Sequence, residues 1–74
     1  MEIVLVTRQG CHLCDHALAA IRSLGLEPEL RDVDADDELH RLYDWRVPVV
    51  LVDGRVVAEG KIDPLRLGQA LQQA

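Results

Sequence analysis

An Asp53-Gly54 pair stands between two apolar runs rich in β-branched residues, at residues 47–52 and 55–58. Asp-Gly pairs connect antiparallel strands tightly, because both residues tolerate the positive φ angles that a two-residue hairpin turn requires. The sequence therefore predicts a β-hairpin over residues 47–58. This feature constrains the fold most, because it makes one part of any sheet antiparallel.

A strand, a helix and an outer strand are predicted ahead of this hairpin. Residues 3–6 are continuously apolar, as expected of a strand that is covered on both faces at the centre of a sheet. Residues 11–24 then show helical periodicity, and Gly25 follows as a typical C-terminal stop. Residues 27–33 alternate between apolar and charged, and Pro28 favours an edge strand. The predicted apolar stripe of the helix is Leu13, Ala17, Ile21 and Leu24.

Two further helices are predicted from capping signals. An acidic stretch at residues 34–38 precedes apolar residues at helical spacing, and carboxylates suit the first turn of a helix. This short helix is expected to end near Asp44. Asp63 is a capping residue ahead of Pro64, and proline suits the first position of a helix. The predicted buried stripe of the last helix is Leu67, Ala70 and Leu71.

The predicted order of elements is β-α-β-α-β-β-α. The strand-helix-strand unit is parallel with a right-handed crossover, whereas the hairpin is antiparallel. The sequence thus predicts an α/β protein with a four-stranded mixed sheet and helices on both faces, which is the thioredoxin/glutaredoxin-like fold. Because a chain of 74 residues can form only one hydrophobic core, residues 1–74 are expected to be a single domain.

Charge and hydropathy argue against several classes of partner. The formal charge of -5 repels phosphate backbones and anionic lipids, so no nucleic-acid partner is expected. The first residues carry neither a basic segment nor an apolar stretch of the length of a signal peptide or membrane span, so no membrane association is expected. The predicted location is the cytoplasm, and the predicted state is a monomer.

The segment Cys11-His12-Leu13-Cys14 lies where the central strand turns into the first helix. Residues i and i+3 share one helix face, so the two sulfurs can form a bond. The first sulfur faces backbone N–H groups that lack partners and the positive end of the helix dipole, both of which favour a thiolate. Cys11 is therefore the expected nucleophile. Cys14 lies one turn deeper and is expected to attack the mixed disulfide and release the reduced substrate.

Two alternatives to redox chemistry remain at this stage. A metal or iron–sulfur carrier would bind its cargo through the same two thiolates, which are soft ligands. Zinc usually needs four ligands, so His12, His16 and His40 would have to converge on the cysteines, and we assign no metal ligands. The other alternative is an interaction domain in which both cysteines are idle.

The combination of motifs resembles the glutaredoxin-like family of small thioredoxin-fold proteins over nearly the whole chain. The resemblance rests on Tyr43 and on three segments, Thr7-Arg8-Gln9-Gly10-Cys11-His12-Leu13-Cys14-Asp15, Val47-Pro48-Val49 and Val52-Asp53-Gly54. It implies thiol-disulfide oxidoreductase activity through the cysteine pair. This combination is far more specific than the CxxC motif alone.

The resemblance also implies a substrate site. Val47-Pro48 matches a family motif in which the proline is cis and lies beside the disulfide, while the backbone of the preceding residue pairs with a bound thiol peptide. Arg8 occupies the place where glutaredoxins have a lysine near the glutathione carboxylate, and a guanidinium could bind that carboxylate through two hydrogen bonds. The alternative for Arg8 is a solvated loop charge.

The segment before the last helix departs from the family pattern. Glutaredoxins have Gly-Gly-x-Asp-Asp there, whereas this chain has Glu59-Gly60-Lys61-Ile62-Asp63-Pro64. Asp63 could meet an ammonium group of glutathione, or it could serve only as the helix cap. Glutathione is accordingly considered as a co-substrate, and no tightly bound cofactor is expected.

Two histidines are predicted to modulate the site. A protonated His12 would stabilise the Cys11 thiolate and make the disulfide more oxidising; alternatively it is exposed without an electrostatic role. His16 could relay the proton of Cys14, or it could be a solvated helix residue. The acids of residues 32–38 are expected to form a solvated cap and turn, although they could also select basic partners.

The sequence as a whole predicts a cytoplasmic thiol-disulfide oxidoreductase that cycles between a dithiol and a Cys11–Cys14 disulfide. Its expected partners are disulfide-containing proteins or small thiols. The sequence does not identify the reductant.

Overall fold

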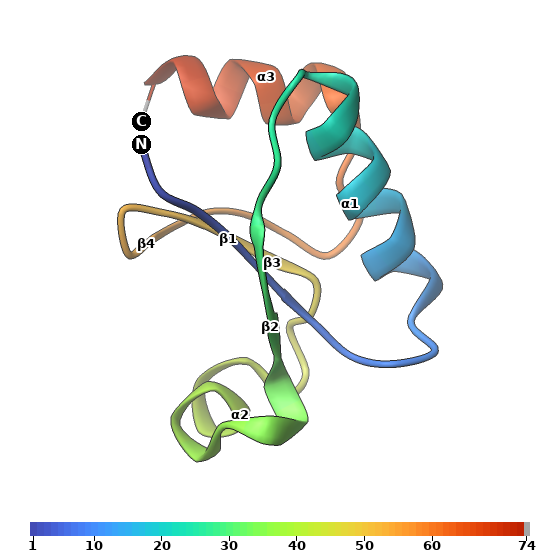
Figure 1. Cartoon of the computed structure of the whole chain (residues 1–74), viewed down its shortest axis with the longest axis vertical. Helices are drawn as coiled ribbons and strands as arrows, with labels where there is room; N and C mark the ends of the chain where they lie inside the picture. The colour runs from blue at the N-terminus through green and yellow to red at the C-terminus, as the bar shows by residue number, and fades with distance from the viewer. Residues whose placement is uncertain (74) are drawn as a thin grey trace.

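The structure, a computed structural model, describes residues 1–73 and contains the predicted strands and helices in the predicted order (Figure 1). The elements are β1 (Ile3–Thr7), α1 (His12–Ser23), β2 (Glu29–Asp32), the 3-10 turn η1 (Val33–Ala35), α2 (Asp37–Tyr43), β3 (Val49–Val52), β4 (Arg55–Glu59) and α3 (Pro64–Gln73). Asp53 and Gly54 connect β3 to β4 with φ angles of 50° and 85°. The predicted hairpin turn is therefore confirmed.

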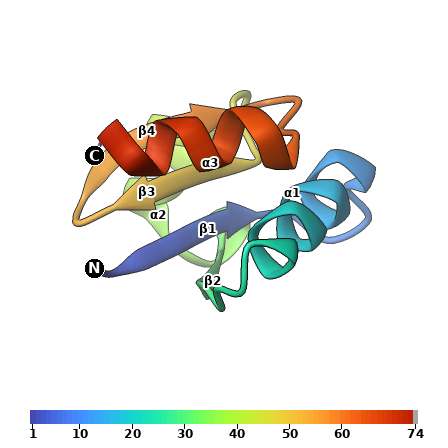
Figure 2. The same ribbon diagram turned by 90° about the horizontal axis from the view of Figure 1, so that it is seen from above.

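The strands form one sheet in the order β2-β1-β3-β4. β1 pairs with β2 in parallel and with β3 antiparallel, and β4 pairs antiparallel with β3. This confirms the four-stranded mixed sheet, with β1 inside it and β2 at an edge, where every residue of the strand is exposed. Figure 2 shows α1 and α3 in front of the sheet and α2 behind it.

The core consists of two apolar clusters, one on each face of the sheet. Side chains alternate along a strand, so β1 contributes to both. Ile3 and Leu5 belong to the larger cluster, which lies between the sheet and the helices α1 and α3. Val6 belongs to the smaller cluster, against which α2 packs through Leu39 and Tyr43. The prediction of helices on both faces is thus confirmed.

The buried stripe of α1 differs from the predicted one. Leu13 and Leu24 remain 42% and 38% exposed. The buried residues of the helix are Cys14, Ala17, Ala20 and Ile21. At 3.6 residues per turn, Leu13 and Leu24 share one face with Ala17, Ala20 and Ile21, but Leu13 stands in the first turn of the helix and Leu24 is its C-cap. The prediction that Leu13 and Leu24 are buried is therefore wrong, because they lie at the two ends of the helix, and Cys14 takes a core position.

The outer strand is shorter than predicted. β2 spans Glu29–Asp32 and not residues 27–33. The Asp32 side chain accepts a hydrogen bond from the N–H of Asp34 over 2.8 Å, and this bond turns the chain into η1. Val33 consequently leaves the sheet edge and is buried in the smaller cluster.

The helix boundaries follow the predicted capping residues. The Asp36 side chain accepts a hydrogen bond from the N–H of Leu39 over 3.0 Å, and the Asp63 side chain accepts one from Arg66 over 2.9 Å. Gly25 follows α1 with a φ of 78°, as expected of a C-terminal stop. Across the described residues, no helix combines the length and the apolar character needed to cross a membrane.

Candidate functional site

The two cysteines lie where β1 passes into α1. Cys11 is the N-cap of the helix, with an extended backbone, and Cys14 lies in its first turn. The backbone N–H of Cys14 donates a hydrogen bond to the Sγ atom of Cys11 over 3.1 Å. The sulfur of Cys11 thus lies at the positive end of the α1 dipole, an environment that stabilises a thiolate. Cys14 is 3% exposed whereas Cys11 is half-buried, so the predicted difference in depth is confirmed.

The proton of Cys14 is held tightly. Burial raises the pKa of this thiol to about 11, and a hydrogen bond with the Cys11 side chain acts in the same direction. The negative charges of Cys11 and Asp15 add to this rise in pKa, while a hydrogen bond with the backbone of Arg8 opposes it. Cys14 is therefore a neutral thiol at neutral pH. Of the two cysteines, Cys11 is the more accessible one.

The raised pKa of Cys14 predicts that the reduced protein loses stability in alkaline solution. A free cysteine has a pKa near 8.5, so the unfolded chain releases this proton at a lower pH than the folded protein. The free energy of unfolding should therefore fall by about 2–3 kcal/mol as the pH rises from about 8.5 to 11. Urea unfolding of the reduced protein across this range measures the loss. Cys14→Ser lacks the ionisable group, so an equal loss in that variant would contradict the prediction.

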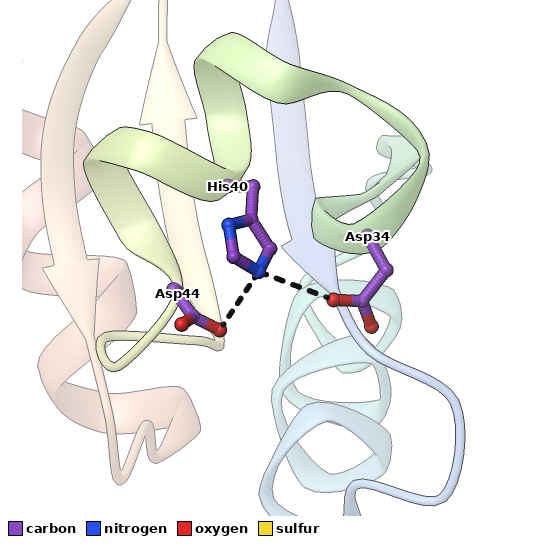
Figure 3. Close-up of side chains that lie close together, drawn as sticks. All are labelled: Asp34, His40 and Asp44. Atoms are coloured by element: carbon purple, nitrogen blue, oxygen red, sulfur yellow. Dashed lines mark ion pairs between the residues drawn. The ribbon is translucent and has the colours of Figure 1, made fainter.

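Arg8 follows β1 and joins a cluster of charged residues from three segments. Its guanidinium donates two parallel hydrogen bonds to the carboxylate of Asp34, each 2.9 Å long. It also donates to the side chain of Asp44 and, over 3.2 Å, to the Asp44 backbone carbonyl. The Nε2 atom of His40 lies 3.8 Å from the Asp34 carboxylate and 3.5 Å from that of Asp44 (Figure 3). The cluster ties the loop that leads to the cysteines to η1 and to the end of α2.

This cluster neutralises Arg8 internally. Hydrogen bonds to Asp34 and Asp44 raise the pKa of Arg8, and the bond to Arg8 lowers the pKa of Asp34. Arg8 is thus not a solvated loop charge, and its contact with a glutathione carboxylate stays a prediction.

Among the described residues, Asp34, His40 and Asp44 place potential metal-ligand atoms within 4.8 Å of one another, and neither cysteine belongs to such a group. The Arg8 guanidinium is already the cationic partner of the Asp34 and Asp44 carboxylates.

The Val47-Pro48 peptide bond is cis, as the resemblance implies, and Pro48 is buried. It precedes β3, which runs antiparallel to β1, so it lies at the end of the sheet where β1 leads into the cysteine loop. The hydrogen bond from Arg8 to the Asp44 carbonyl connects the two loops directly. Trp45, between Asp44 and the cis proline, is 94% exposed at the same end. The pairing of the Val47 backbone with a substrate stays a prediction.

The remaining predicted site residues lie on α1 and at the start of α3. His12 and His16 are both exposed. His16 and Asp63 line a hollow of about 460 Å³ between the two helices, together with Leu13 but with neither cysteine. The capping role of Asp63 is confirmed by its bond to the backbone of α3. The modulating roles of the histidines and a glutathione contact of Asp63 stay predictions.

A smaller hollow, of about 180 Å³, lies beside Cys14. It is lined by Thr7, Arg8, Gln9, Gly10, Cys14, Asp15, Leu18, Leu30 and Asp32. Of the predicted site residues, it brings Arg8 and Cys14 together. Asp15 and Asp32 were not predicted as site residues, because the only signal in the sequence was the concentration of carboxylates near the cysteine pair and after the outer strand.

Comparisons with known proteins agree with this fold. The profile of the glutaredoxin-like domain (DUF836) matches residues 2–72. The X-ray structure of protein XcR50 from X. campestris, a structural genomics target, is 32% identical, covers 97% of each chain and has a TM-score of 0.84. The solution structure of Ne2328 from Nitrosomonas europaea is 31% identical, covers 92% of this chain and 87% of that chain, and has a TM-score of 0.79. No curated protein matches this chain.

The matched residues include both cysteines at the start of α1 and the Val47-Pro48 turn before β3. The two solved structures confirm the thioredoxin-like architecture over nearly the full chain. Two neighbouring cysteines within that architecture indicate thiol chemistry. Because the family profile covers almost every residue, this chain belongs to the glutaredoxin-like domain family.

Proposed function

We propose that this protein is a thiol-disulfide oxidoreductase in which Cys11 is the nucleophile and Cys14 the resolving thiol. The observation that carries the proposal is the position of the Cys11 Sγ at the N-cap of α1, where it accepts the N–H of Cys14. An ionised sulfur accepts such a hydrogen bond more strongly than a neutral one. Membership of the glutaredoxin-like domain family supports the same chemistry.

The reaction begins when the Cys11 thiolate attacks one sulfur of a substrate disulfide. A bond forms between Cys11 and that sulfur, the substrate S–S bond breaks, and the second substrate sulfur leaves as a thiolate that takes a proton from water. Cys14 then loses its proton to solvent and attacks the Sγ of Cys11, which releases the first substrate sulfur as a thiolate. The substrate has gained two electrons, and the protein holds a Cys11–Cys14 disulfide.

The pKa of Cys14 fits its place as the second nucleophile. In the dithiol form, burial and the neighbouring Cys11 raise this pKa to about 11, so Cys14 does not compete for the substrate. When Cys11 is bonded to a substrate sulfur, its negative charge is gone. The pKa of Cys14 should then fall, and the resolving attack becomes easier at the moment it is needed.

A further thiol must reduce the Cys11–Cys14 disulfide to complete the cycle. Glutathione or a dithiol protein belongs to the chemical class that can do this, with glutathione as a co-substrate and not as a tightly bound cofactor. The substrates are disulfides of proteins or small thiols, and the backbone of Val47 beside the cis proline is the proposed pairing surface. We place the reaction in the cytoplasm, where cellular thiols are kept reduced.

Equilibration of the protein in glutathione buffers of graded potential tests the proposal. We expect one two-electron transition between the dithiol and an intramolecular disulfide, with a midpoint between about -180 and -270 mV, the range of related oxidoreductases. Alkylation of the remaining thiols and mass spectrometry then give the oxidised fraction and locate any glutathione adduct. Cys14→Ser, the control, cannot show the two-electron transition. A dithiol that stays reduced in the most oxidising buffer would rule out the proposed function.

A further inference from the structure

The hollow beside Cys14 combines apolar and acidic side chains. Leu18 of α1 and Leu30 of β2 supply the apolar part, and Leu30 is 50% exposed. Asp15 and Asp32 supply carboxylates, and both residues are exposed. The volume of about 180 Å³ is smaller than the roughly 300–1,000 Å³ of pockets that enclose whole small-molecule ligands. The hollow therefore has room for one side chain and not for a complete tripeptide.

The charge of this hollow is negative, because the one cationic side chain among its lining residues is already paired. The guanidinium of Arg8 is bound to Asp34 and Asp44, and these three side chains together carry a net negative charge. Within the described part of the chain, no lysine or arginine forms an ion pair with Asp15 or Asp32. An external cation would thus meet two carboxylates that no internal cation neutralises.

We infer that this hollow receives the side chain of a lysine or arginine that flanks the disulfide of a protein substrate. These residues join an aliphatic stem to a cationic head, so the stem would lie along Leu18 and Leu30 and the head near Asp15 and Asp32. The hollow is lined by Cys14, one helical turn from the proposed nucleophile, and by Gly10, the residue before it, so it borders the place where the substrate disulfide would react. The inference rests on the proposed function, because it assigns the hollow to the substrate of the cysteine pair.

The same charges disfavour an anionic substrate at this position. The carboxylates of glutathione would approach Asp15 and Asp32, while the hydrogen-bond donors of Arg8 are directed at its own acidic partners. Repulsion between charges of the same sign reduces both the rate of encounter and the affinity of a complex. The site should therefore prefer disulfides in basic protein segments over those with acidic neighbours.

Two peptides with the same disulfide, differing only in a lysine or a glutamate next to one cysteine, test this inference. The measured quantity is the second-order rate constant with which each peptide oxidises the reduced protein. At low ionic strength we expect the lysine peptide to react about tenfold faster, and we expect added salt to bring the ratio toward one. A peptide with glutamine at this position should react at an intermediate rate.

Charge-removing variants locate the preference in the hollow. Asp15→Asn/Asp32→Asn should reduce the ratio of the two rate constants to about two or less. Asparagine retains a carbonyl oxygen that can accept the N–H of Asp34, so the turn into η1 is preserved. The matched variant Glu2→Gln/Asp37→Asn makes the same charge change at residues that do not line the hollow, and it should keep the ratio near that of the wild type. Because both peptides react with the same cysteines, altered thiol reactivity cancels in the ratio.

The possible outcomes separate this inference from the proposed function. Equal rate constants for both peptides with the wild-type protein would overturn the inference and leave the oxidoreductase function intact. A ratio that the matched variant abolishes as well would also overturn it, because the preference would then come from the net charge of the whole protein. If neither peptide oxidises the protein, the proposed function fails, and the inference fails with it.

Discussion

Cys11→Ser is expected to lower the rate of disulfide reduction by at least about 1,000-fold, whereas Cys14→Ser should stop the reaction at the mixed disulfide. In the first variant a hydroxyl replaces the thiol, and a hydroxyl ionises far less readily, so little nucleophile is present. In the second variant the backbone N–H of residue 14 can still donate to the Sγ of Cys11, so the first step survives. The serine hydroxyl cannot complete the second step, because it does not displace the substrate sulfur.

Incubation of each variant with a disulfide peptide, followed by mass spectrometry of the intact protein and of its fragments, measures this difference. Cys14→Ser should accumulate one peptide adduct per chain, located on Cys11. The double variant Cys11→Ser/Cys14→Ser provides the background. Turnover that survives in Cys11→Ser, or adducts that form on Cys14 in that variant at the wild-type rate, would reverse the assigned roles.

Ile21→Ala is expected to lower the free energy of unfolding by about 2–5 kcal/mol. Ile21 is fully buried in the larger cluster between the sheet and the helices α1 and α3, so the shorter side chain leaves a cavity there. A chain of 74 residues has a total stability of about 4–11 kcal/mol, so the loss is a large share of the total. Urea unfolding followed by circular dichroism measures the change.

Leu65→Ala is the matched control for this experiment. Leu65 lies in α3 with most of its surface exposed, so its truncation should change the free energy of unfolding by no more than about 0.5 kcal/mol. Equal effects of the two variants would contradict the packing of α1 against the sheet, on which the position of the cysteine pair depends.

Much of the fold could be predicted because its determinants are local. Asp53-Gly54 form the hairpin turn through the conformational preferences of two adjacent residues, and Asp63-Pro64 start α3 in the same way. The position of the cysteine pair at a helix start also follows from a short stretch of sequence. The cis bond before Pro48 is different, because spacing alone does not select it. Only the resemblance to a family implies it.

The charged cluster around Arg8 could not be predicted by such local rules. Arg8 is 26 residues from Asp34 and 36 residues from Asp44, so their contact depends on how η1 and α2 pack against the sheet. The resemblance singles out Arg8 because it stands where glutaredoxins have a lysine, and that match contains no information about the surrounding carboxylates. Its pairing partners therefore became visible only in three dimensions.

Helical periodicity predicts the inward face of α1 but not how far burial extends along the helix. Leu13, Ala17, Ile21 and Leu24 follow the helical period, yet the first and the last of them stand at the ends of the helix and remain exposed. The face that is buried contains mostly small residues, and small side chains let a helix approach a sheet closely. Leu13 stays exposed in the first turn, whereas Cys14, the next residue of this turn, is buried.

The exposed edge strand β2 affects how the protein behaves at high concentration. The outer edge of such a strand presents backbone N–H and C=O groups with which another chain could pair. Glu29, Arg31 and Asp32 are exposed along it, and Pro28 precedes it. A second copy that paired with this edge would place its own charged side chains next to these residues. β2 therefore resists aggregation by extension of the sheet.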